Sequence, residues 1–268
     1  QQLSVSTNKN YGGRVIVPDA NMAEANVGGL VKFTRAHLVL DGGLGVAFKG
    51  FQTYQTRTLN SPGERIQPFA KNAVASNASF GFALTPVNLY LFRIGVKGNV
   101  GTGFRPGNLA ELSCNGLHEG SIRYELGNPN LKNETNITTD FTVDLFSYKI
   151  LDVKFSSYFN QFNNYIYLAP TKDSFFGYQV FKYEQTNAKI LGTETSVVLH
   201  LIKNFDWVNI WSQIAGTKTT GASTYLPFMS PRKYTSRFVY IYSKKDRLFT
   251  ITPEVVFVGD QLNTEIGR

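Results

Sequence analysis

Apolar and polar residues alternate one by one along several segments of the chain. Residues 38–49 show the pattern most clearly: Asp41, Lys49 and small residues share one side, and the other side is apolar, with Leu38, Leu40, Leu44, Val46 and Phe48. Segments 140–145, 193–201 and 248–257 repeat this pattern. A period of two predicts β-strands that have one apolar face and one polar or small face.

Short and long connections alternate between the predicted strands. The short linkers lie around residues 35–36, 85–87, 148–150, 203–204 and 245–246, and the long ones, at 10–24, 56–72, 105–132, 169–177 and 219–230, are rich in Gly, Pro and Asn. This rhythm is typical of an outer-membrane barrel, which has tight periplasmic turns and long extracellular loops. We therefore expect an all-β fold, an antiparallel up-and-down meander of about eleven strands with no long helix. The strands are expected at 2–9, 25–35, 37–55, 73–85, 88–104, 133–147, 151–168, 178–201, 205–218, 231–244 and 247–260.

The alternation also predicts which side chains face lipid and which face the lumen. A register slip of one residue would reverse every assignment, so the prediction is a strict one. The outward-facing set is Leu38, Leu40, Leu44, Phe141, Val143, Leu145, Phe249 and Val255, and the inward-facing set is Asp41, Lys49, Asp140, Asp144 and Glu254.

The strand count indicates that the barrel is incomplete. Single-chain bacterial barrels have even numbers of strands. An unpaired strand edge in hydrocarbon leaves backbone groups unsatisfied, at several kcal/mol each. We therefore expect residues 1–268 to form a single incomplete β-barrel domain that lacks further strands.

Composition narrows the class of protein. Aromatic residues make up 14% and charged residues only 17% of the chain, against roughly 25% charged residues in soluble domains. The net charge of +8 comes from scattered Lys and Arg. We expect these residues to lie in solvated loops or to contact anionic lipid, and we expect no nucleic-acid partner. Cys114 is the only cysteine, so an internal disulfide is excluded. The sequence contains no Gly-x-Ser-x-Gly nucleophile motif, and we expect no enzyme.

Residues 101–137 carry two motifs that name a family. The stretch GFRPGNLAEL at 103–112 ends one strand, and RYELGNPNLKNE at 123–134 begins another. Both resemble the mid-barrel signature of TonB-dependent receptors. Asn164–Leu168, Tyr183–Ala188 and Leu226–Pro227 with Pro231 resemble later motifs of the same family, in the same order.

The resemblance implies a barrel of 22 strands with a plugged lumen, located in the bacterial outer membrane and contacting its lipid. It implies active import of a scarce nutrient (a metal ion, haem or a metal chelate) with energy from the TonB complex, which acts through an N-terminal plug absent from these residues. The Gly-Leu-His-Glu-Gly loop and the Tyr-Ile-Tyr-Leu strand end are most similar to zinc- and haem-uptake receptors. An extracellular soluble all-β binding module and a passive porin remain as alternatives.

The longest loop holds the candidate ligand site. Imidazole and carboxylate groups bind zinc, and imidazole also ligates haem iron. His118 is thus the candidate metal ligand, with Glu119, Glu111 and Tyr124 as further candidates, although a solvated loop or aromatic packing explains them as well. No intrinsic cofactor is expected; the transported ligand would be zinc, an iron chelate or haem.

Other signature residues are expected to be structural. Arg105 should point to the lumen and form an ion pair there. The glycines around Gly103 do not form a phosphate-binding motif, and we expect no helix after them. Phe104, Pro106, Asn108, Tyr165 and Tyr167 complete the structural set, and the two tyrosines Tyr124 and Tyr167 are expected near strand ends.

Overall fold

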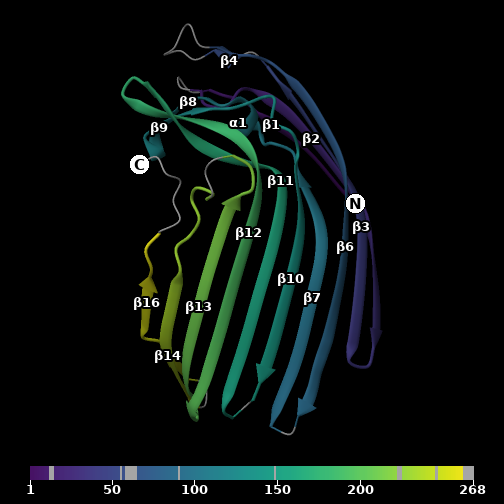
Figure 1. Ribbon diagram of the computed structural model, residues 1–268, viewed down its shortest axis with the longest axis vertical. Helices are drawn as coiled ribbons and strands as arrows, with labels where there is room; N and C mark the ends of the chain where they lie inside the picture. The colour runs from purple at the N-terminus through teal and green to yellow at the C-terminus, as the bar shows by residue number, and fades with distance from the viewer. Residues whose placement is uncertain are drawn as a thin grey trace.

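One curved antiparallel sheet forms the body of the computed structural model (Figure 1). The structure describes residues 1–11, 15–54, 56–57, 65–89, 91–147, 149–221, 225–244 and 247–261. The path of the sheet is β1 (Gln2–Asn8), β2 (Ala20–Arg35), β3 (Leu38–Thr53), β6 (Ala70–Leu89), β7 (Phe92–Arg105), β10 (Glu134–Phe146), β11 (Leu151–Phe175), β12 (Tyr178–Ile202), β13 (Phe205–Lys218), β14 (Lys233–Lys244) and β15 (Arg247–Ile251). β16 (Glu254–Val258) continues along the same edge of β14.

The eleven-strand meander expected from the sequence is confirmed, and each strand of the path pairs with its neighbours in the chain. Additional short elements lie in the long loops: β4 (Thr56–Arg57), β5 (Arg65–Ile66), α1 (Leu109–Ser113), β8 (Asn115–His118), the 3-10 helix η1 (Glu119–Ser121) and β9 (Arg123–Leu126). Within the described residues, no helix is long and apolar enough to cross a bilayer.

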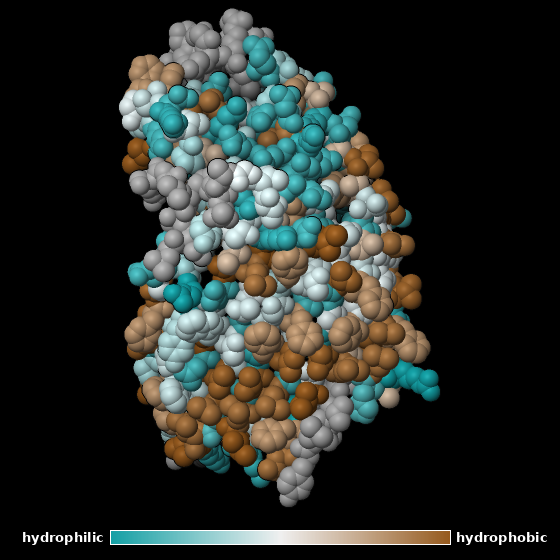
Figure 2. Space-filling view, viewed as in Figure 1, coloured by the Kyte–Doolittle hydropathy of each residue, from teal (hydrophilic) through white to brown (hydrophobic). Residues whose placement is uncertain are grey.

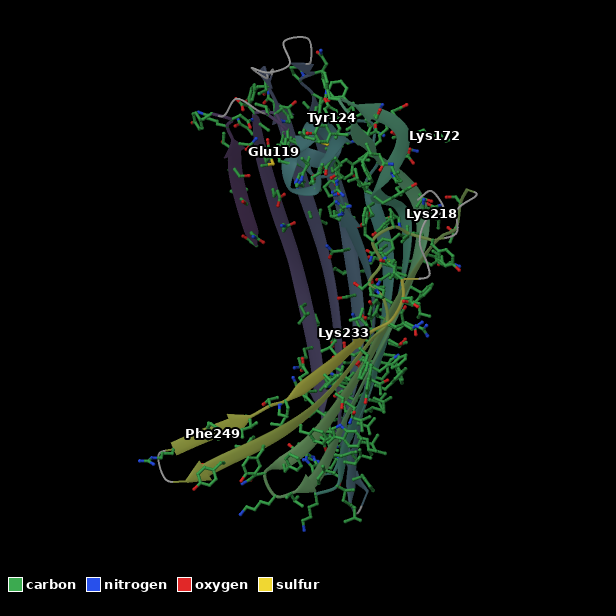
Figure 3. All side chains as sticks on the ribbon, turned by 90° about the vertical axis from the view of Figure 1, so that its left-hand side faces the viewer. Glu119, Tyr124, Lys172, Lys218, Lys233 and Phe249 are labelled. Carbon is green, nitrogen blue, oxygen red and sulfur yellow. The ribbon has the colours of Figure 1, made fainter. Side chains whose placement is uncertain are left out.

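The sheet curls around a concave face, and α1 lies on that face near the loop end (Figure 3). Phe51 of β3 is buried against Leu112 of α1, so the odd-numbered side chains of β3 point inward. The ladder between β2 and β3 has no register shift, which places Asp41 and Lys49 inward and Leu44 outward. Glu134 of β10 forms an ion pair with Arg105, which also binds Glu111 of α1 on the concave face. Asp140 and Asp144 lie an even number of residues along β10 from Glu134, so they also face inward.

Stretches of the ladders without a register shift carry this assignment to the far edge of the sheet. Asp140 pairs with Tyr158, Tyr158 with Gly192, and Gly192 with Ile214 on β13. From Val208 of β13 the same face continues through Arg237 to Glu254, which form an ion pair at 3.7 Å. All the predicted inward and outward assignments are therefore confirmed.

The outward side chains form an apolar belt over the half of the sheet that ends in the short turns (Figure 2). Among them, Leu44 is 73% and Phe249 58% exposed. The other half of the same face, toward the long loops, is mostly hydrophilic. Apolar side chains that face outward in a broad band, rather than toward each other, fit a lipid-facing surface and not a soluble sandwich.

Several strand boundaries differ from the expected ones, and three of the differences have a clear place in the structure. The turn predicted at 85–87 lies after Leu89, because Pro86, which has no N–H to donate, is accommodated by a register shift between Leu84 and Val87. The loop expected at 169–177 is almost entirely strand, since β11 and β12 meet in a tight turn at Phe176 (φ 49°) and Gly177 (φ 81°). Positive φ at both central residues defines the tight hairpin turn that suits the twist of the strands. β2 begins at Ala20 rather than at 25.

We expect Val197→Lys, on the outward face of β12, to lower the free energy of unfolding in a bilayer by about 2–4 kcal/mol, since it places a charge at the level of the hydrocarbon. Its inward-facing neighbour Glu194 is exposed, so Glu194→Lys is the matched control and should change stability far less. Equal losses in urea-induced unfolding of the two variants in lipid vesicles would contradict the facing of β12.

Candidate functional site

An ion-pair cluster holds the first signature motif against the wall of the barrel. The Arg105 guanidinium at the end of β7 donates to both carboxylate oxygens of Glu111, at 2.9 and 2.7 Å, and to Glu134 Oε2 at 3.1 Å. Glu134 also accepts a hydrogen bond from the backbone N–H of Ile166 at 2.8 Å. The ion pair expected for Arg105 is thus present, and it joins β7, α1, β10 and β11.

The same residues begin α1. The Asn108 side chain accepts from the Glu111 N–H at 2.8 Å, and the Glu111 carboxylate accepts from the Asn108 N–H at 2.8 Å. This reciprocal capping satisfies backbone donors that a helix start leaves free. The expectation that no helix follows the glycines was wrong: the Asn-x-x-Glu spacing at 108–111 is a capping signal that starts α1.

A small apolar core fixes α1 from below. Leu112 and Leu131, which are almost fully buried, pack with Phe51 of β3 and Ile166 of β11. The core therefore contains one side chain from each signature motif and two from distant strands. Phe51 could not be assigned to this core from the sequence, because nothing in strand alternation shows which inward residue a loop will cover.

The second signature motif closes over the end of α1. Gly127 donates to Cys114 O at 2.7 Å and Asn128 to Glu111 O at 2.8 Å. A Cβ at Gly127 would lie 2.4 Å from the Ser113 backbone nitrogen, so only glycine fits there. Farther along, the Gln185 amide of β12 binds both the N–H and the carbonyl of Lys132, at 2.8 and 2.7 Å.

A hairpin of β8 and β9 rises from this base and was not foreseen. β9 pairs in parallel with β12, through Tyr124 and Val180, and this is a parallel pairing within an otherwise antiparallel sheet. Residues 118–121 form its exposed tip, where the Ser121 hydroxyl lies 2.9 Å from His118 Nδ1. The candidates His118 and Glu119 therefore sit at the tip, and Figure 3 shows Glu119 at the loop end of the molecule.

The other two candidates lie inside the structure of the loop. Glu111 is buried and bound to Arg105 and Asn108. Tyr124 is buried, donates to Asn115 Oδ1 at 2.6 Å, and packs on Phe175 with ring centroids 4.5 Å apart. These contacts make both residues part of the support for the tip. Within the part of the chain that the structure describes, no three His, Cys, Asp or Glu side chains are grouped so that they could hold a metal ion.

Aromatic rings and cations gather on the projecting hairpin of β11 and β12. Phe176 is 86% exposed, and Lys172 and Lys182 are exposed as well. Arg123 lies over the Phe181 ring at 5.3 Å, and Lys218 over the Tyr167 ring at 4.3 Å. Lys172 and Lys218 both lie at the loop end in Figure 3.

The remaining signature tyrosines pack beside this surface. Tyr167 donates to Glu184 Oε2 and accepts from Lys218 Nζ, both at 3.2 Å. Tyr165 meets Phe162 edge to face at 5.1 Å, next to the core of Ala188, Ile190 and Leu226. Leu226 is fully buried there, so the Leu-Pro motif is an anchor for its loop.

A long antiparallel meander with an outward apolar belt, short turns at one end and packed loops at the other defines an outer-membrane β-barrel. The model of the family described as TonB dependent receptor-like, beta-barrel, matches residues 11–263. The chain belongs to this family of outer-membrane receptors. A comparison with curated proteins found no match.

Solved structures share the fold at low sequence identity. The copper transporter OprC is 16% identical with a TM-score of 0.69, over 83% of this chain and 33% of that one. The Serratia marcescens hemophore receptor HasR, in complex with its hemophore HasA and heme, is 14% identical with a TM-score of 0.64, over 88% and 44%. The ferric-catecholate import receptor Fiu from E. coli K12 is 15% identical with a TM-score of 0.59, over 90% and 35%. The chain thus spans less than half the length of each.

We expect Arg105→Leu to release the loop, because it leaves the carboxylates of Glu111 and Glu134 without their cation in a largely buried place. The cost should be about 2 kcal/mol, below that of a fully buried pair because the Arg105 side chain is 42% exposed. Limited proteolysis should then cut residues 105–133 readily, while Arg232→Leu, which replaces an exposed arginine, should leave the pattern unchanged. An unaltered digestion of the Arg105 variant would contradict the clamp.

Cys114 should resist thiol reagents in the folded protein. Burial, reinforced by the carboxylate of Glu125, raises the pKa of its thiol to about 12, so the nucleophilic thiolate is scarce at pH 8. Maleimide labelling of the peptide that contains Cys114 should be roughly a thousandfold slower than that of a free thiol, and should become fast in denaturant. Ser121→Cys, at the exposed hairpin tip, provides the reactive control; rapid labelling of Cys114 before unfolding would show that the loop is open.

Proposed function

We propose that the chain forms part of a receptor that imports a scarce nutrient across the outer membrane, and that it has no enzymatic activity. The observation that carries this proposal is the ordered platform at the loop end. There the Arg105 cluster and the Leu112 core hold a hairpin tip and an aromatic, cationic surface out toward the external medium. A rigid base under exposed side chains is what ligand capture requires.

The side chains at this end favour an anionic aromatic chelate, such as haem or an iron chelate, over a bare metal cation. Lys172 and Lys182 are exposed, whereas the carboxylates of Glu111, Glu125 and Glu134 are held by arginines. Exposed rings such as Phe176 and Phe228 offer flat surfaces for stacking. His118 at the neighbouring tip would supply an axial or auxiliary ligand.

Transport in this proposal depends on parts of the receptor other than these residues. Residues 1–268 would be a single incomplete barrel domain, and a plug in the lumen would receive energy from the TonB complex, as the family resemblance implies. The inward wall supports such a role, since Gly43 and its partner Ser79 present only a small side chain between β3 and β6. Small inward residues let another domain approach the wall closely.

The test uses the full-length receptor in cells that depend on it for growth. Lys172→Ala combined with Lys182→Ala should raise the haem or ferric-chelate concentration needed for half-maximal growth by about tenfold, since two cation contacts are lost. Growth on limiting zinc should not change. Lys9→Ala combined with Lys189→Ala removes the same charge from exposed positions elsewhere and serves as the matched control. A defect on zinc alone, or none on any ligand, would contradict the proposed ligand class.

His118→Ala combined with Glu119→Ala tests the hairpin tip separately. The strands and the Arg105 cluster do not depend on these side chains, so barrel stability to heat in detergent should stay near that of the wild type. Growth on haem should fall if His118 contacts the ligand. If the uptake of zinc, haem and iron chelate were all unchanged, the tip would be a solvated loop with no ligand contact.

A further inference from the structure

We propose that four cations at the turn end form a collar that binds the headgroup phosphates of anionic phospholipid in the periplasmic leaflet. The collar consists of Arg35, Lys149, Lys203 and Arg247, one at each of four short connections between strands. All four side chains are exposed. The short connections share one end of the sheet, at the bottom of Figure 1, opposite the end that carries the long loops.

Each collar residue directly adjoins exposed apolar side chains of the belt. Arg35 follows Phe33 on the same outward face of β2, and Lys203 follows Ile202, which is 69% exposed. Ile150 stands beside Lys149, and Phe249 lies on the same face as Arg247. A cation that ends an apolar column lies where hydrocarbon gives way to headgroups, so its charge meets phosphate there.

Stacked aromatic rings mark the same depth next to the collar. Phe205, two residues after Lys203, stacks on Phe238 with centroids 5.7 Å apart and planes 12° apart, and Trp207 stacks on Phe238 at 5.8 Å. Rings of this kind concentrate at the boundary between hydrocarbon and headgroups. Their position next to the collar is a second argument, independent of charge, for placing the collar at the membrane–water boundary.

The acids that the structure describes at this end do not neutralise the collar. Asp152 and Asp206 lie at this end too, but both are bound to His200, at 3.3 and 2.8 Å, on the inward face. Considering only the residues that the structure describes, no carboxylate forms an ion pair with Arg35, Lys149, Lys203 or Arg247. The collar therefore presents uncompensated positive charge to the leaflet that the short turns face.

The experiment counts bound lipid on the full-length receptor. The receptor is reconstituted in nanodiscs of phosphatidylcholine and phosphatidylglycerol in equal amounts, and native mass spectrometry measures which lipid it retains on release. We expect several-fold enrichment of phosphatidylglycerol for the wild type, decreasing as salt is raised because the contacts are electrostatic. Replacement of all four collar residues by Gln should bring the ratio close to one.

The matched control removes four exposed cations outside the collar: Lys9→Gln, Lys132→Gln, Lys189→Gln and Arg232→Gln. It changes the net charge equally and should keep the enrichment. Heat-induced mobility shifts on gels check that both variants are folded, and a collar variant that fails to fold is replaced by the pair Lys149→Gln and Lys203→Gln, which should halve the enrichment. Enrichment that survives in the folded collar variant, or that is lost equally in the control, would overturn the proposal; in the first case an acidic protein partner becomes the competing occupant.

Discussion

Hydrocarbon offers no hydrogen-bond partner, so every backbone N–H and C=O at the depth of the membrane must be paired within the sheet, and an unpaired group costs several kcal/mol. The ladders show how strictly this constraint acts. Register shifts occur between Leu84 and Val87, Phe162 and Tyr165, Pro170 and Ser174, and His200 and Ile202. The shifts at Leu84 and His200 lie near the turn ends of their strands, and those at Phe162 and Pro170 lie between the middle of β11 and its loop end, so the pairing through the belt is unbroken. Unbroken pairing in turn makes the alternation of side chains regular over the whole sheet.

Above the belt a different balance holds the chain. The loop from Arg105 to Glu134 is stabilised as a small soluble domain would be, by a core of Leu112 and Leu131 and by buried carboxylates satisfied by one arginine. Removing one partner from such a cluster costs more than the pair contributes, because the other charges stay buried. The main role of Arg105 is therefore to hold the loop in one conformation. The pairing of the strands below the loop does not depend on this side chain.

The predictable part of the fold is the part that the membrane dictates. Alternation in segments such as 193–201 revealed both the strands and their faces, because each spanning residue has only lipid or lumen to face. The β11–β12 hairpin beyond Ile166 projects past the belt, so its outward side chains need not be apolar. The alternation therefore did not reveal that β11 continues to Phe175. α1 and the β8–β9 hairpin depend on contacts with Phe51, Gln185 and Val180, far away in sequence, which alternation does not report. The motif residues were identifiable, but the tertiary contacts that hold Glu111 and Tyr124 within the loop cannot be read from the sequence.

Both ends of the sheet carry exposed cations, and the nearby acids are engaged in different ways at each end. At the loop end the buried carboxylates Glu111, Glu125 and Glu134 are engaged by arginines, so these three do not neutralise the exposed lysines of the hairpin. At the turn end Asp152 and Asp206 bind His200 on the inward face, so they do not neutralise the outward cations, whose charge remains available to the membrane surface. These five acids are engaged within the protein, so at the surface they offset less of the excess of 27 Lys and Arg over 19 Asp and Glu than their number alone indicates.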